Sequence, residues 1–92
     1  MATVHVSTHP LVAHHVCMLR DPATRSPEFR RVVRQLTRLV GVEATAALPT
    51  HDVRVPTPLG EASGQRLADR IAIVPILRAG LGMADGLLEL IP

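Results

Sequence analysis

The residues best suited to chemistry lie near the C-terminal end of the chain, where an apolar run gives way to a short turn of small residues. The run Ile71–Leu77 ends at a single cation, Arg78, and Ala79, Gly80 and Gly82 follow closely. Small residues let the backbone approach a ligand, free N–H groups at a helix start attract anions, and a guanidinium binds two phosphate oxygens at once. This pattern indicates an anion site, and phosphate is the anion that suits it.

Two elements must position this turn. The run 71–77 is short, rich in β-branched residues and apolar along almost its whole length, which is typical of a strand covered on both faces. After the turn, apolar residues recur at helical spacing and mark one face of a helix: Met83, Leu87, Leu88 and Ile91. The sequence therefore predicts a strand, a glycine turn and a helix in that order.

The turn on its own does not decide the function. Tight strand-to-helix turns use glycine for backbone reasons in many folds. Gly80 and Gly82 do not complete a G-x-G-x-x-G fingerprint, and a chain without lysine has no P-loop lysine. From the residues alone, phosphate binding and a purely structural turn both stay open, whereas a generic nucleotide-binding module is disfavoured.

Two helices are predicted before the turn. The first begins at His9-Pro10, with Thr8 or His9 near the cap, and ends at Asp21-Pro22. The second spans about 26–40, with Ser26 as N-cap and Pro27 as the first helical residue. Its apolar residues follow helical spacing: Phe29, Val32, Val33, Leu36, Leu39 and Val40. Gly41 is expected to end this helix or to kink it.

A hairpin or projecting flap is expected between the second helix and the apolar run. Val53 and Val55 alternate with polar residues, while Pro56 and Pro58 exclude a central position in a sheet. The stretch 60–64 is rich in turn-forming residues and is expected to form the turn. No repeat or linker divides the chain, so residues 1–92 are predicted to be a single, incomplete domain.

Other polar clusters have two interpretations each. His14 and His15 are neighbours, and consecutive helical residues diverge by about 100°, so they do not share one ligand on a regular helix. Surface or partly packed histidines are the favoured interpretation, and no metal site is predicted. The arginines of the second helix form either an anion or partner surface or, as is usual for an amphipathic helix, a solvated face; they are Arg30, Arg31, Arg34 and Arg38.

Composition excludes several classes of protein. The chain has 92 residues with one Phe and no Tyr or Trp, so aliphatic side chains must supply a thin core. A formal net charge of +2 without aromatic stacking residues does not imply nucleic-acid binding. A single cysteine, Cys17, fits a reducing, cytoplasmic setting. No run reaches the ~18 apolar residues of a spanning helix, so no membrane association is expected.

The chain resembles the uracil phosphoribosyltransferases. The resemblance rests on the run 74–83 with Asp85-Gly86, which is similar to that family's pyrophosphate loop, and on supporting motifs in family order: His9-Pro10-Leu11, Leu19-Arg20-Asp21, Glu43-Ala44-Thr45 and Thr57-Pro58-Leu59-Gly60. Val42 departs from the pattern, because many relatives have a tyrosine there. The implied fold class is α/β, the N-terminal part of a type I phosphoribosyltransferase fold with a helical arm, a β-hairpin, the first core parallel strand and the following helix.

The resemblance also implies an activity and its ligands. Uracil and 5-phosphoribosyl diphosphate would give UMP and pyrophosphate with Mg²⁺, and Arg78, Ala79 and Gly80 would bind the diphosphate. No residue here is expected to be catalytic or to bind a metal. A cis or otherwise strained peptide is expected at or beside Leu77-Arg78. GTP activation, as in some relatives, stays open, and a homo-oligomer is expected for the full-length protein.

Two family motifs are not found in these residues. The Thr-Gly-Gly loop that holds the ribose 5′-phosphate is missing, and so is the uracil-recognition segment. The chain is therefore expected to be the N-terminal part of such an enzyme and to be inactive alone. The alternative is a truncated, non-catalytic paralogue that acts as an oligomerisation or interaction module.

Overall fold

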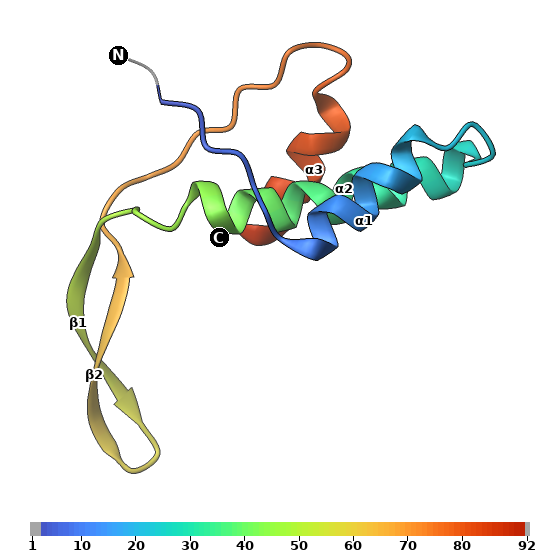
Figure 1. The fold of residues 1–92 in the computed structure, drawn as a ribbon. Helices are drawn as coiled ribbons and strands as arrows, with labels where there is room; N and C mark the ends of the chain where they lie inside the picture. The colour runs from blue at the N-terminus through green and yellow to red at the C-terminus, as the bar shows by residue number, and fades with distance from the viewer. Residues whose placement is uncertain (1–2, 92) are drawn as a thin grey trace.

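The computed structural model describes residues 3–91, which form a group of three helices and a separate hairpin (Figure 1). The elements are α1 (Pro10–Arg20), α2 (Ser26–Ala44), β1 (Thr50–Thr57), β2 (Gly60–Leu67) and α3 (Leu81–Leu90). In Figure 1, α1 lies along α2, α3 crosses α2, and the hairpin projects away from all three. The Cα radius of gyration is 17.0 Å, against about 12 Å for a compact chain of this length. The structure is thus an open one.

Helix α1 has the bounds that the sequence predicts. His9 is its N-cap, and the His9 Nδ1 atom accepts a hydrogen bond of 3.1 Å from the Leu11 N–H. Pro10 occupies the first turn, where a missing N–H leaves no hydrogen bond unmade. Asp21 is the C-cap, and Pro22 follows it. None of the helices among the described residues is long and apolar enough to span a bilayer.

Helix α2 corrects two details of the prediction. Arg25, not Ser26, is the N-cap, because the Phe29 N–H already donates to the Arg25 carbonyl at 2.8 Å and so closes the first turn one residue earlier. The helix also continues through Gly41 to Ala44. Leu87 and Leu90 of α3 lie directly over Gly41, so the glycine serves close packing there and does not end the helix.

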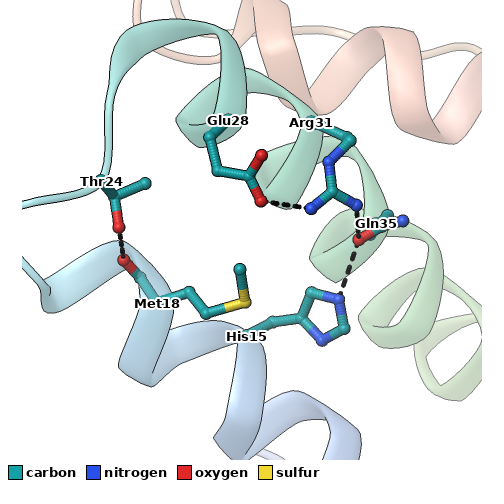
Figure 2. Close-up of polar contacts among 6 residues, drawn as sticks. All are labelled: His15, Met18, Thr24, Glu28, Arg31 and Gln35. Carbon is teal, nitrogen blue, oxygen red and sulfur yellow. Dashed lines mark hydrogen bonds and ion pairs between the residues drawn. The ribbon is translucent and has the colours of Figure 1, made fainter.

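A chain of polar contacts joins α1 to α2, as Figure 2 shows. His15 of α1 places Nε2 3.0 Å from Gln35 Oε1, and the same oxygen accepts from Arg31 Nη1 at 3.2 Å. Arg31 in turn pairs with Glu28. At the other end of α1, the Thr24 hydroxyl donates to the Met18 carbonyl at 2.7 Å. His15 is therefore partly packed and held between two helices.

The hairpin is a two-stranded antiparallel sheet with its turn at Pro58–Leu59. The prediction of a turn over 60–64 was wrong, because these residues belong to β2. The Leu59 N–H donates to Thr57 Oγ1 at 3.3 Å, and Gly60 has φ +119, so the chain reverses earlier. Pro56 lies in β1 and is tolerated because the sheet has no central strand. The hairpin packs against none of the described helices.

Residues 71–77 do not form the predicted parallel strand. A strand needs a neighbour to complete its backbone hydrogen bonds, and the described residues supply no second strand beside this run. Figure 1 shows it as an extended connection between β2 and α3. Its apolar side chains are open to solvent, with Val74 88% exposed. The expected helix is present after this run, but the run itself forms no hydrogen-bonded ladder with another described strand.

Helix α3 packs on α2 through Gly86, Leu87 and Leu90, so only part of the predicted apolar face lies against α2. Gly86 is buried against α2, and Leu87 and Leu90 lie over Gly41. Met83 and Leu88, predicted to face a core, are exposed. The correction has a physical reason: helices approach most closely where one of them has no side chain, and the larger residues then point away from α2.

Candidate functional site

The candidate site is the turn at residues 77–80, between the unpaired run and α3. A cis peptide bond joins Leu77 and Arg78, as predicted. The Gly80 N–H donates to the Ile76 carbonyl at 2.8 Å, and the Leu81 N–H donates to the Arg78 carbonyl at 3.2 Å. These two bonds close the turn onto the first residues of α3.

Gly80 is required by the turn itself. A Cβ at this position would lie 3.0 Å from both the nitrogen and the carbonyl oxygen of Ile76. Both are backbone atoms of the same tight turn, so they have little room to move away. The glycine therefore permits the close approach of the backbone that the sequence suggested, although its φ of −79 is one that any residue adopts.

The residues predicted to bind the diphosphate, Arg78, Ala79 and Gly80, are consecutive in the chain and therefore lie close together. Arg78 is exposed, and among residues 3–91 it takes part in no ion pair. The Ala79 N–H has no backbone or side-chain acceptor within the described part of the chain. The Gly80 N–H, in contrast, is occupied by the Ile76 carbonyl. The guanidinium and the Ala79 amide are thus the groups that are free to meet an anion.

A pocket of about 430 Å³ separates the turn from the first half of α2. It brings Arg30 and Arg34 to the side of Ala79, and Asp85 faces the same space. The sequence placed both arginines on an outer face, and their spacing of four residues was the signal that they share one side of α2. Asp85 lies beyond the first turn of α3, so it does not compensate the helix dipole.

No metal-binding cluster is found in the described range 3–91, where no group of three His, Cys, Asp or Glu side chains converges. His14 and His15 place their rings 5.6 Å apart at an interplanar angle of 84°. His15 instead faces the Leu11 carbonyl through Nδ1 at 2.7 Å and Gln35 through Nε2. The two imidazole nitrogens of His15 thus take part in contacts within α1 and between α1 and α2. Nitrogen atoms do not suit a magnesium ion, which prefers oxygen ligands.

Comparison with solved structures defines the class of fold. The AQ2163 protein from Aquifex aeolicus superposes with a TM-score of 0.88 and 32% sequence identity, over 97% of this chain and 43% of that one. Together with the family match described next, this superposition identifies the helical arm, hairpin, turn and following helix as the N-terminal part of a phosphoribosyltransferase fold, as expected from the sequence.

Comparison with protein families then gives the particular family. The family model described as uracil phosphoribosyltransferase matches residues 6–92. Proteins of that name from Roseiflexus sp. strain RS-1 and from Staphylococcus epidermidis are 49% and 46% identical over the whole chain. The chain belongs to the uracil phosphoribosyltransferase family. It spans 44% of the length of these relatives.

Proposed function

We propose that this chain supplies the diphosphate-binding part of a uracil phosphoribosyltransferase, which converts uracil and 5-phosphoribosyl diphosphate to UMP and pyrophosphate. One observation carries the proposal: Arg78, in no ion pair among residues 3–91, precedes Ala79, whose amide has no acceptor there, in a tight turn before α3 in a chain of this family. Such a turn suits a diphosphate because a guanidinium and a backbone amide on consecutive residues can both donate to phosphate oxygens.

The reaction explains why the diphosphate must be held. A uracil nitrogen forms a bond to the anomeric carbon while the bond from that carbon to a diphosphate oxygen breaks, and the uracil proton is lost. Negative charge grows on the leaving diphosphate as the sugar becomes oxocarbenium-like. Arg78 and the Ala79 N–H accelerate the step to the extent that they bind this growing charge more tightly than the intact substrate.

Mg²⁺ belongs to this proposal only as an ion carried by the substrate. Magnesium is commonly bound through substrate phosphates and one or two carboxylates, and it keeps several waters. The described residues offer no cluster that would hold it alone.

A complete protein that carries these residues provides the test. UMP formation is measured from uracil and 5-phosphoribosyl diphosphate with Mg²⁺, and GTP is added in a parallel series to ask whether it activates. Light scattering of the same sample gives the oligomeric state. Formation of UMP that depends on all three components supports the proposal, and its absence from well-folded protein contradicts it.

A second function is favoured by a different observation. The apolar residues of the run 71–77 are uncovered, and the hairpin packs against none of the described helices. A truncated paralogue could use both surfaces to bind a full-length relative as a non-catalytic interaction module. Sequencing the transcript beyond codon 92 separates the two. An open frame that continues into an acidic, Thr-Gly-Gly-containing loop favours the enzyme, and a stop codon favours the module.

A further inference from the structure

Helices α2 and α3 come into close contact at Gly86, eight residues after Arg78. A Cβ on residue 86 would lie 2.9 Å from the Arg34 carbonyl oxygen and 3.0 Å from Thr37 Cβ. Thr37 is 4% exposed, and its hydroxyl donates to the Val33 carbonyl at 2.8 Å, so its side chain is held in place. Neither neighbour is the free end of a flexible side chain.

Toward the turn the same two helices are farther apart. The pocket of about 430 Å³ lies there, between Arg30 and Arg34 of α2 and Ala79, Gly82 and Asp85. A Cβ on Gly82 would meet Val33 only at 3.5 Å, an ordinary contact distance. Beyond Gly86, an ion pair between Arg38 and Glu89 joins the two helices again. Gly86 is thus a close contact between α3 and α2, and the pocket lies on the side of this contact that faces the turn.

The turn moves with α3 because hydrogen bonds join them. The Leu81 N–H donates to the Arg78 carbonyl, and the Ala84 N–H donates to the Gly80 carbonyl at 3.0 Å. A displacement at Gly86 therefore reaches the turn along one turn and a half of rigid helix. The described residues leave a pocket of about 430 Å³ between the turn and α2, so α2 does not hold the turn in place there by close packing.

From these contacts we infer that Gly86 is a positioning residue for the diphosphate turn, an inference that rests on the proposed function. Its missing side chain sets the separation of α2 and α3 and, through it, the place of Arg78 and Ala79. Gly86→Ala would bring a Cβ to 2.9 Å from a backbone oxygen where ordinary contacts begin at 3.4 Å, so α3 must lift by about half an ångström.

Gly41 provides a matched control on the facing helix. A Cβ there would meet only the terminal methyl groups Leu87 Cδ2 at 2.9 Å and Leu90 Cδ2 at 3.0 Å. Leucine ends can rotate to another rotamer, whereas a backbone carbonyl within α2 cannot. Gly41→Ala adds the same methyl group to the same helix pair without requiring α3 to move, and Gly41 lies far from the turn.

The test compares both variants in a complete protein that carries these residues. A misplacement of about 1 Å at a reactive centre can cost about a hundredfold in rate, so half that shift in Gly86→Ala is expected to lower kcat/KM for 5-phosphoribosyl diphosphate by about tenfold. KM for uracil should change by less than about twofold, because this turn does not bind the base in the proposed reaction. Gly41→Ala should leave both parameters near wild type.

The outcomes separate the inference from the proposed function. A rise in KM for uracil as large as the loss in kcat/KM for 5-phosphoribosyl diphosphate, or wild-type kinetics in Gly86→Ala, would overturn the positioning role. If the wild-type protein forms no UMP, the proposed function fails, and calorimetric Kd values for pyrophosphate in the same variants still decide the positioning role. If Gly86→Ala does not fold, Arg38→Gln loosens the same helix pair without added bulk. It should raise KM for 5-phosphoribosyl diphosphate by about threefold, and an unchanged KM would contradict the inference.

Discussion

The two faces of α3 differ in what covers them. The face toward α2 is closed: Gly86 is buried, and an ion pair joins Arg38 to Glu89 across the helices. The face away from α2 is open, with Leu88 64% exposed and Met83 also uncovered. The closed face packs against α2, whereas no described element covers the open face.

The open face continues into the run before the turn. We use the term uncovered surface for the exposed apolar residues Val74, Ile76, Leu77, Met83 and Leu88. Contiguous exposed apolar area and unpaired strand edges both favour association. The comparison indicates that the helices hold the turn from one side only. The other side is left uncovered by the described residues.

The largest effect is expected for the isolated 92 residues. We expect them to form no measurable UMP and to be aggregated, oligomeric or only partly folded in dilute buffer, because the uncovered surface has nothing to pack against. Purified chain is assayed with uracil, 5-phosphoribosyl diphosphate and Mg²⁺, and light scattering and calorimetry report its state. UMP formation would show that the open face needs no cover for activity. A cooperative transition from a clean monomer would show that the fragment folds by itself.

Arg78 lies in the turn that precedes α3 and should have the next largest effect. In a complete enzyme, Arg78→Ala removes a charge-assisted contact of about 1.5–3 kcal/mol, which lowers kcat/KM for 5-phosphoribosyl diphosphate by about tenfold to a hundredfold. Arg78→Lys should recover only part of the loss, because an ammonium lacks the bidentate geometry. Steady-state kinetics that stay at wild-type values in both variants would remove Arg78 from the site.

The sequence predicts local structure well, but it predicts poorly which apolar residues are buried by other parts of the chain. Helix α1 follows from His9, Pro10 and Asp21, whose effects on the chain are local. The turn at Gly80 and the cis bond at Leu77-Arg78 were also predicted, the latter through the family resemblance. The helix and the turn depend on residues close together in the chain, so short-range chemistry is sufficient to anticipate them, whereas the cis bond was anticipated only from the resemblance.

The errors concern partners that lie outside a local window. Apolar spacing predicted that Met83 and Leu88 face a core, because it shows which residues could be buried but does not show what is present to bury them. In the same way, the run 71–77 has a strand composition but no neighbour to pair with in the described residues. Gly86 as the contact with α2 could not be read from α3 alone, because the distance to the Arg34 carbonyl depends on both helices.

A smaller effect is expected from the only large side chain that these helices bury completely. Val32 is fully buried among the described residues, and Val32→Ala removes two methyl groups, a destabilisation of about 2 kcal/mol with the cavity included. Amide hydrogens of α2 should then exchange about thirtyfold faster. Val74→Ala removes the same atoms from the uncovered surface and should leave exchange unchanged. If the two variants behaved alike, the contrast between covered and uncovered regions would be wrong.

The smallest effect tests how α1 is held on α2. Gln35 Oε1 lies 3.0 Å from His15 Nε2 and accepts from Arg31, and Gln35→Leu removes that oxygen while keeping an apolar side chain at this position (Figure 2). A hydrogen bond of this kind contributes about 1 kcal/mol, so amides of α1 should exchange about fivefold faster while those of α3 stay as they are. Gln35→Glu keeps an oxygen that both donors can reach and should preserve or increase the protection of α1. His14→Ala, on the exposed neighbour of His15, is the control and should change neither helix. Faster exchange in Gln35→Glu as well would show that the polar chain does not hold α1, and that apolar contacts around Val32 do so alone.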